Sequence, residues 1–149
     1  MTLWWLVPLW KTLHVAGIVM LMGIVAVIDL RIFGVAKGLP LGPLQRLMPW
    51  AAGGFAVSLV SGILLVGANP QQYIGMPLNL AFFAKMSGVV LVGLNDILYF
   101  ATGLKREVDG VDAGGAASAS AKIVAGVSLA LWFGVMYLGT TLPFFGVAQ

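Results

Sequence analysis

Two basic side chains interrupt long apolar stretches of this sequence, and their residue types suggest cofactor or metal chemistry. His14 is the only histidine, and Lys85 lies in a later apolar stretch. Neutral imidazole is the commonest protein ligand for haem iron and for transition metals. A lone histidine near a membrane interface is as often a polar residue hydrogen-bonded across helices. The residues alone therefore leave two interpretations open: a site at His14 and Lys85, or a hydrogen-bonded histidine with Lys85 as an outward-snorkelling anchor.

A second polar group lies nearer the other end of the same stretches. It comprises Asp29, Arg31, Asn95 and Asp96. Charged groups at membrane depth are costly unless they face the protein interior, water or a ligand. On a helix Asp96 returns to the face of Lys85, because eleven residues make about three turns. We expect this secondary cluster to be an anchor in which Asp29 pairs with Arg31 or with nearby basic loops.

The stretches that must position these residues are long enough to be membrane helices. The chain has 149 residues, of which 60% are hydrophobic and 9% charged, whereas a soluble domain has roughly a quarter charged residues. A bilayer core about 30 Å thick needs roughly 20 apolar residues in a helix. Four stretches satisfy this length, at 12–34, 47–67, 78–104 and 121–142. The sequence predicts one all-α domain over residues 1–149, an integral membrane four-helix bundle.

Charge in the loops predicts how the bundle is oriented. Six lysines and arginines flank the connections at 31–46 and 105–122, and only Lys11 lies on the opposite side. The positive-inside rule places such basic loops in the cytoplasm. Both termini are then expected on the outer, periplasmic side. The small, glycine-rich and alanine-rich segment 105–120 is expected to be a flexible cytoplasmic linker without a core of its own.

Glycines recur along all four predicted spans. In lipid, helices associate through close backbone approach at small residues. A compact bundle is expected from these positions: Gly17, Gly23, Gly53, Gly54, Gly62, Gly88, Gly93, Gly126, Gly134 and Gly139.

The first span resembles the opening helix of a broad group of bacterial membrane proteins. The group includes the integral-membrane protoporphyrinogen IX oxidase and the membrane domain of the copper resistance protein D family. In the segment LWKTLHVAGIVMLMGIVAVIDLRIFGV the likeness rests on an aromatic-rich entry, on His14 after Lys11, on Gly23, and on Leu30 with Arg31. Later positions that share the pattern are Arg46, Pro49, Gly62 and Lys85.

The sequence is most similar in texture to an uncharacterised bacterial four-helix membrane family. The shared signatures are Asp-Leu-Arg at 29–31, Met-Pro-Trp at 48–50, and Lys85 followed by Asn95. The resemblance implies a multi-pass protein of the bacterial cytoplasmic (inner) membrane. It also implies that His14, as axial ligand of the iron, and Lys85 form a haem b site, because the corresponding residues of the oxidase are linked to haem and activity.

The leading expectation is therefore a small haem b-binding protein, a redox or electron-transfer component. If the chain is an enzyme, the resemblance implies an oxidoreductase of the protoporphyrinogen oxidase type. The second axial ligand stays open between Lys85, a methionine, water and His14 of another copy. The expected partners are the lipid bilayer and either further copies of the chain or a larger membrane complex.

Two other functions remain open. One is copper or ion handling, with Met20 or Met22 as soft ligands beside His14 and with Asp29 or Asp96 farther in. The other is a non-catalytic subunit packed on a larger membrane complex. The chain has no cysteine and no phosphate-binding or zinc-binding motif. The net charge is +3, but the basic residues lie beside the predicted spans, so we expect no nucleic-acid partner.

Overall fold

The computed structural model describes residues 5–68 and 80–145, and their side chains as far as residue 141. Every regular element in this part of the chain is a helix, so the all-α prediction is confirmed. Residues 78 and 79, the predicted start of the third span, lie outside the described residues. The helices are α1 (Leu6–Phe33), α2 (Leu41–Gln45), α3 (Met48–Ala68), α5 (Leu80–Ala101), α6 (Leu104–Asp109) and α7 (Ala119–Phe145).

Four helical stretches are long and apolar enough to cross a membrane: Leu6–Phe33, Leu41–Ala68, Leu80–Ala101 and Ala119–Thr141. The first starts six residues before its predicted start at 12, because the apolar run before Lys11 continues the helix. The third ends at Ala101 rather than at 104. Gly103 has a φ of 76°, a left-handed conformation that glycine adopts without strain and that ends the helix here.

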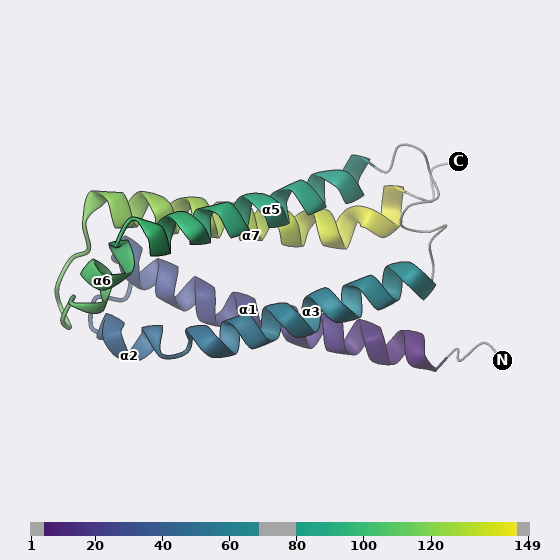
Figure 1. The fold of residues 1–149 in the computed structure, drawn as a ribbon, viewed down its shortest axis with the longest axis horizontal. Helices are drawn as coiled ribbons and strands as arrows, with labels where there is room; N and C mark the ends of the chain where they lie inside the picture. The colour runs from purple at the N-terminus through teal and green to yellow at the C-terminus, as the bar shows by residue number, and fades with distance from the viewer. Residues whose placement is uncertain (1–4, 69–79, 146–149) are drawn as a thin grey trace.

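The long helices form two antiparallel pairs that lie one above the other (Figure 1). α1 packs along α3, α5 packs along α7, and α1 also packs on α7, which joins the two pairs. We call the end with the start of α1 and the end of α7 the terminal end. The opposite end, where α2 and α6 lie, is the loop end (Figure 1).

Two glycines bring α1 and α3 into direct backbone contact. A Cβ atom added at Gly17 would lie 2.6 Å from the Gly54 carbonyl oxygen, and one added at Gly54 would lie 2.8 Å from the Gly17 carbonyl oxygen. No real side chain tolerates such distances without a shift of the helices. The small-residue packing expected from the sequence therefore operates at this crossing.

The loop end contains an apolar core that includes residues of the two connections. Leu41 of α2 and Val108 of α6 are fully buried, and Ala117 is 6% exposed. They join Ile28, Ile32, Tyr99, Ala121 and Ala125 in one apolar cluster. α6 and Ala117 thus pack under the ends of the long helices, and the flexible linker expected over 105–120 stays a prediction. Val108 packs in one apolar cluster with Leu41 of the other connection. The sequence of 105–120 alone does not reveal this long-range contact.

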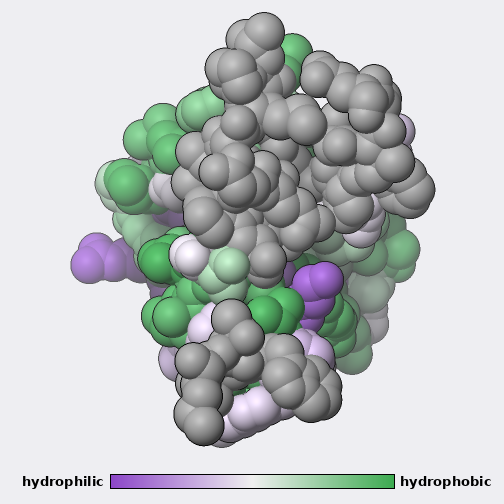
Figure 2. Space-filling model, turned by 90° about the vertical axis from the view of Figure 1, so that its right-hand side faces the viewer, coloured by the Kyte–Doolittle hydropathy of each residue, from purple (hydrophilic) through white to green (hydrophobic). Residues whose placement is uncertain are grey.

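Most of the apolar surface of the long helices faces outward. Large exposed side chains include Val15 and Val19 of α1, Ile63 of α3 and Val90 of α5. Figure 2, a view onto the terminal end, shows hydrophobic residues along the visible flanks with few hydrophilic ones between them. Exposed apolar area of this extent matches a lipid environment.

Candidate functional site

His14 is held against α3 by a hydrogen bond to the backbone. Its Nδ1 lies 2.7 Å from the Ser58 carbonyl oxygen. The Ser58 and Ser61 hydroxyls are 3.3 and 3.5 Å from the same nitrogen. Gly62 makes room for the ring, since a Cβ there would lie 3.1 Å from His14 Cε1. The imidazole is thus wedged between α1 and α3 near the terminal end.

The Ser58 contact determines the tautomer of the neutral ring. A carbonyl oxygen only accepts, so Nδ1 carries the hydrogen and donates it to Ser58. Nε2 is then the lone-pair nitrogen. This arrangement is the usual one for a metal-ligating histidine, in which the second nitrogen is fixed by a carbonyl or carboxylate. In this tautomer Nε2 carries the lone pair that ligation of a metal would require.

Lys85 belongs to the other helix pair. Its side chain extends along Gly139 of α7, where an added Cβ would lie 3.4 Å from Nζ. Lys85 is half-buried, and it makes no ion pair within the described residues. His14 and Lys85 both lie toward the terminal end, on α1 and α5, but their recorded contacts lie on different helices. Lys85 is nevertheless close enough to His14 to act on it electrostatically.

The methionines that sequence analysis considered as soft ligands serve packing. Met22 is buried in the apolar cluster with Leu21 and Trp132. The Met20 methyl group lies at the crossing beside Gly54. Within the described residues, no group of three or more His, Cys, Asp or Glu side chains is placed to hold a metal ion.

Arg31 does not pair with Asp29, which corrects one expectation for the secondary cluster. Its guanidinium is 1% exposed and donates to three backbone carbonyls of the loops. The distances are 2.5 Å from Nε to Leu39, 3.1 Å from Nη2 to Asp112 and 3.3 Å from Nη1 to Gly115. Arg31 therefore clamps the two loops of the loop end together, aided by a 2.7 Å bond between their backbones, from Gly114 to Lys37.

Asp29 is left without a cation. It is 7% exposed, and its Oδ2 has no hydrogen-bond partner among the described residues. Ser128 of α7 lies beside the carboxyl, and Asp96 of α5 is the nearby like charge. The ion pair recorded in the described part of the chain joins the exposed Lys105 and Asp109, at 2.5 Å.

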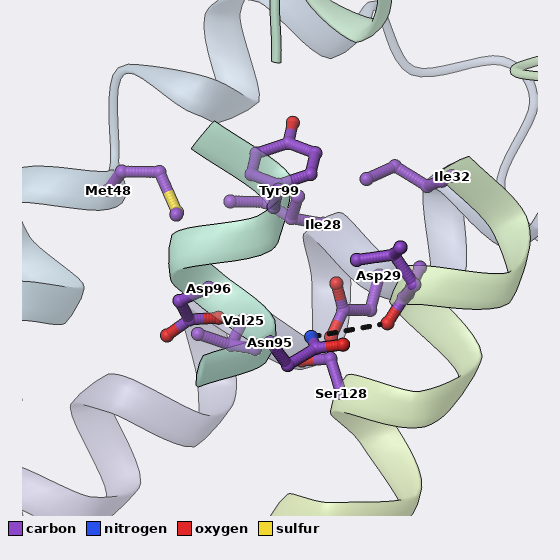
Figure 3. A pocket seen from close by; sticks show the side chains of 11 residues that line it. Val25, Ile28, Asp29, Ile32, Met48, Asn95, Asp96, Tyr99 and Ser128 are labelled. Carbon is purple, nitrogen blue, oxygen red and sulfur yellow. Dashed lines mark hydrogen bonds between the residues drawn. The ribbon is translucent and has the colours of Figure 1, made fainter. Parts of the chain in front are cut away.

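A cavity of about 40 Å³ adjoins Asp29 at the loop end (Figure 3). Asn95 Nδ2 donates to the Val124 carbonyl at 3.4 Å. Tyr99 accepts a 2.7 Å hydrogen bond from Gln45 Nε2. The structure thus brings Asp29, Asn95 and Asp96 of the predicted secondary cluster to one cavity. Its lining also includes Val25, Ile28, Ile32, Met48, Tyr99, Val124, Ala125 and Ser128.

Sequence reasoning missed the residues that complete both sites. Ser58 pairs with His14, Ser128 lies next to Asp29, and Gln45 bonds to Tyr99. Each is a polar residue within an apolar stretch, and this is the sequence feature that could have indicated it. Serine hydroxyls inside helices often bond their own backbone, as Ser61 does to Val57 at 2.6 Å, so the signal does not identify a partner.

Fold and site together define an all-helical chain with four helices long and apolar enough to cross a membrane. It carries one histidine whose Nδ1 is hydrogen-bonded to the Ser58 carbonyl, and one cavity next to Asp29. The chain matches no protein-family model, no curated protein and no solved structure.

Proposed function

We propose that this chain is a small haem b-binding protein of the bacterial inner membrane and that it acts as a redox or electron-transfer component. The observation that carries the proposal is the 2.7 Å hydrogen bond from His14 Nδ1 to the Ser58 carbonyl. It fixes the ring and leaves the Nε2 lone pair, which would hold the iron of a bound haem. Bound haem would supply one-electron chemistry through its iron, with a potential that depends on the axial ligands.

The surroundings of His14 fit this role. Gly62 leaves space at the ring, and the apolar helices around it would exclude water from the iron. Lys85 supplies the positive charge near the terminal end that a haem propionate requires, although its present contact is with Gly139. Because His14 is the only histidine, a second histidine ligand would come from a second copy of the chain, and the other possible ligands are Lys85, a methionine or water. A haem shared between two copies would make the protein a homodimer.

An absorption spectrum tests the haem proposal directly. The chain is produced with supplemented haem precursor, purified in mild detergent through a histidine-free tag, and recorded oxidised and then dithionite-reduced. Wild type is expected to show a Soret band that shifts on reduction, and His14→Ala is expected to lose it. Thr12→Ala is the matched control, since Thr12 is exposed and bonds only its own helix at Pro8 among the described contacts. A wild-type spectrum without a Soret band rejects the proposal.

Three further variants separate ligation from folding. His14→Gly is expected to regain the band when imidazole is added, because the free ring occupies the vacated position. Ser58→Ala is expected to keep it, since the bond to His14 uses the backbone carbonyl. Gly62→Val is expected to lose it, because its side chain would meet His14 Cε1. A haem content of one per two chains would support the shared site, whereas one per chain would assign the second position within one copy.

We also propose that the loop end faces the cytoplasm and both termini the periplasm. The support is the six basic residues at the loop connections against Lys11 at the terminal end. The absence of native cysteine makes this testable. With a membrane-impermeant maleimide on intact cells, Lys11→Cys is expected to be labelled and Lys37→Cys only after permeabilisation. Both positions are exposed in the structure, and the reverse pattern would contradict the proposed orientation.

A further inference from the structure

The cavity at the loop end contains a carboxylate whose charge nothing in the described residues balances. Asp29 is 7% exposed, and its Oδ2 is buried without a hydrogen-bond partner among the described residues. Arg31, two residues along, is engaged by three loop carbonyls instead. An isolated ionised carboxylate away from water costs many kcal/mol, so such groups bind a counter-charge or a proton.

The cavity next to Asp29 is lined by further oxygen atoms from other helices. Asn95 of α5 donates its amide nitrogen to Val124, which leaves its Oδ1 as an acceptor. The Ser128 hydroxyl of α7 lies beside the Asp29 carboxyl. Figure 3 shows Asn95 and Ser128 around the cavity with Asp29, and Asp96 on the same stretch of α5. Three helices thus contribute oxygen-bearing side chains to the lining of one cavity.

The size and chemistry of this space restrict its occupant. About 40 Å³ has room for an ion with at most a few waters. Carboxylate, amide and hydroxyl oxygens prefer hard cations over soft ones. Asp29 alone brings one buried negative charge, with Asp96 half-buried nearby. Within the described residues no third carboxylate, histidine or cysteine joins them, as a tight divalent site would require.

We propose that this cavity between α1, α5 and α7 binds a small hard monovalent cation, with sodium as the representative ion. Asp29 Oδ2, Asn95 Oδ1 and Ser128 Oγ supply protein ligands, and Asp96 adds attraction without a direct bond. The site is independent of haem binding at His14. An ion bound here would link the packing of α1, α5 and α7 to the cation concentration on the loop side.

Thermal unfolding of the purified full chain tests the site. The protein is melted in detergent with lithium, sodium, potassium or choline chloride at equal ionic strength. Sodium is expected to raise Tm above choline by about 5 °C at saturation, because ligand binding to the folded state stabilises it. Asp29→Asn is expected to lose this difference. Asp112→Asn is the matched control, since that side chain is exposed, and it is expected to keep the full shift.

A second measurement keeps the test valid if Asp29→Asn does not fold. Asp96→Asn and Ser128→Ala are each expected to raise the sodium concentration for half-maximal effect about tenfold. The proposal is overturned if no alkali cation exceeds choline in the wild type, or if folded Asp29→Asn retains the sodium effect. Stabilisation by acid alone, with no alkali response, would show that a proton occupies the Asp29 carboxyl and would also overturn it. The titratable groups around Asp29 in that case are Asp96 and Tyr99.

Discussion

The two ends of the bundle differ in how their buried polar side chain is hydrogen-bonded. At the terminal end, His14 has its Nδ1 bonded to a backbone carbonyl, so that Nε2 carries the lone pair. At the loop end, Asp29 has a buried oxygen with no partner in the described residues. A hydrogen-bonded imidazole with one lone pair, as at His14, is typical of a permanent metal ligand. An unpaired carboxylate, as at Asp29, favours an exchangeable ion. The contrast separates two candidate sites that differ in both location and chemistry.

The ends also differ in how their backbone is held. The loop end is tied by Arg31 and by the core under α2 and α6. Near His14 the helices of one pair meet at the Gly17 and Gly54 crossing. Substitutions at these positions are therefore expected to affect the stability of the two ends separately.

The largest effect is expected from Arg31→Gln. It removes charge-assisted hydrogen bonds to Leu39, Asp112 and Gly115 and leaves buried carbonyls unpaired, a loss of about 3–5 kcal/mol in the free energy of unfolding. Denaturant unfolding in detergent measures the loss, and limited proteolysis should reveal cleavage within 110–118. Arg46→Gln, at an exposed neighbouring position, should change stability little. Equal effects of the two variants would refute the clamp.

Gly17→Ala is expected to cost about 2–3 kcal/mol, because the new methyl group would meet the Gly54 carbonyl and push the helices apart. Gly23→Ala is the matched control, since a Cβ there meets nothing within 4 Å. It should be neutral or stabilise by up to about 1 kcal/mol through helix propensity. Unfolding curves of the two proteins in one detergent compare them. A tolerated Gly17→Ala would contradict the direct backbone contact.

Neutralising the polar residues should move stability in opposite directions at the two ends. His14→Ala loses a hydrogen bond and its packing, at a cost of about 2 kcal/mol. Asp29→Asn removes an unpaired buried charge and should gain about 1 kcal/mol in choline buffer without alkali cation. Both are measured as shifts of the unfolding midpoint. Destabilisation by Asp29→Asn under these conditions would mean that the carboxylate has a partner and that the contrast is wrong.

The smallest effect is expected from Lys85→Met. Within the described residues Lys85 makes no ion pair, so its replacement by an apolar side chain of similar length should change stability by less than about 1 kcal/mol. Chemical unfolding checks this. A loss of several kcal/mol in the free energy of unfolding would show that Lys85 stabilises the fold at the terminal end.

How much the sequence could predict follows from how local each signal is. The four long helices and the small-residue crossing at Gly17 were predictable, because the length of an apolar stretch and the glycines within it are local features of the sequence. The pairing of Asp29 with Arg31 was a poor expectation, since residues two apart on a helix point to different sides. The true partners of Arg31 lie in two separate loops, at Leu39, Asp112 and Gly115. Such long-range pairs depend on tertiary packing.

The same limit applies to the sites. His14 stood out as a lone histidine, but its Ser58 partner lies 44 residues away and is a backbone atom that any residue supplies. Ser128 and Gln45 carry no local pattern that links them to Asp29 or Tyr99. Haem binding at His14 remains a prediction that rests on the tautomer and on resemblance, and the loop-end cavity came only from the structure.

One measurement tests the central contrast most directly: reduced-minus-oxidised absorption of wild type, His14→Ala and Asp29→Asn, purified side by side without histidine tags. The account predicts a haem difference spectrum in wild type and in Asp29→Asn, and none in His14→Ala. A spectrum that survives in His14→Ala, or that is absent from all three, would contradict the assignment of haem to the terminal end.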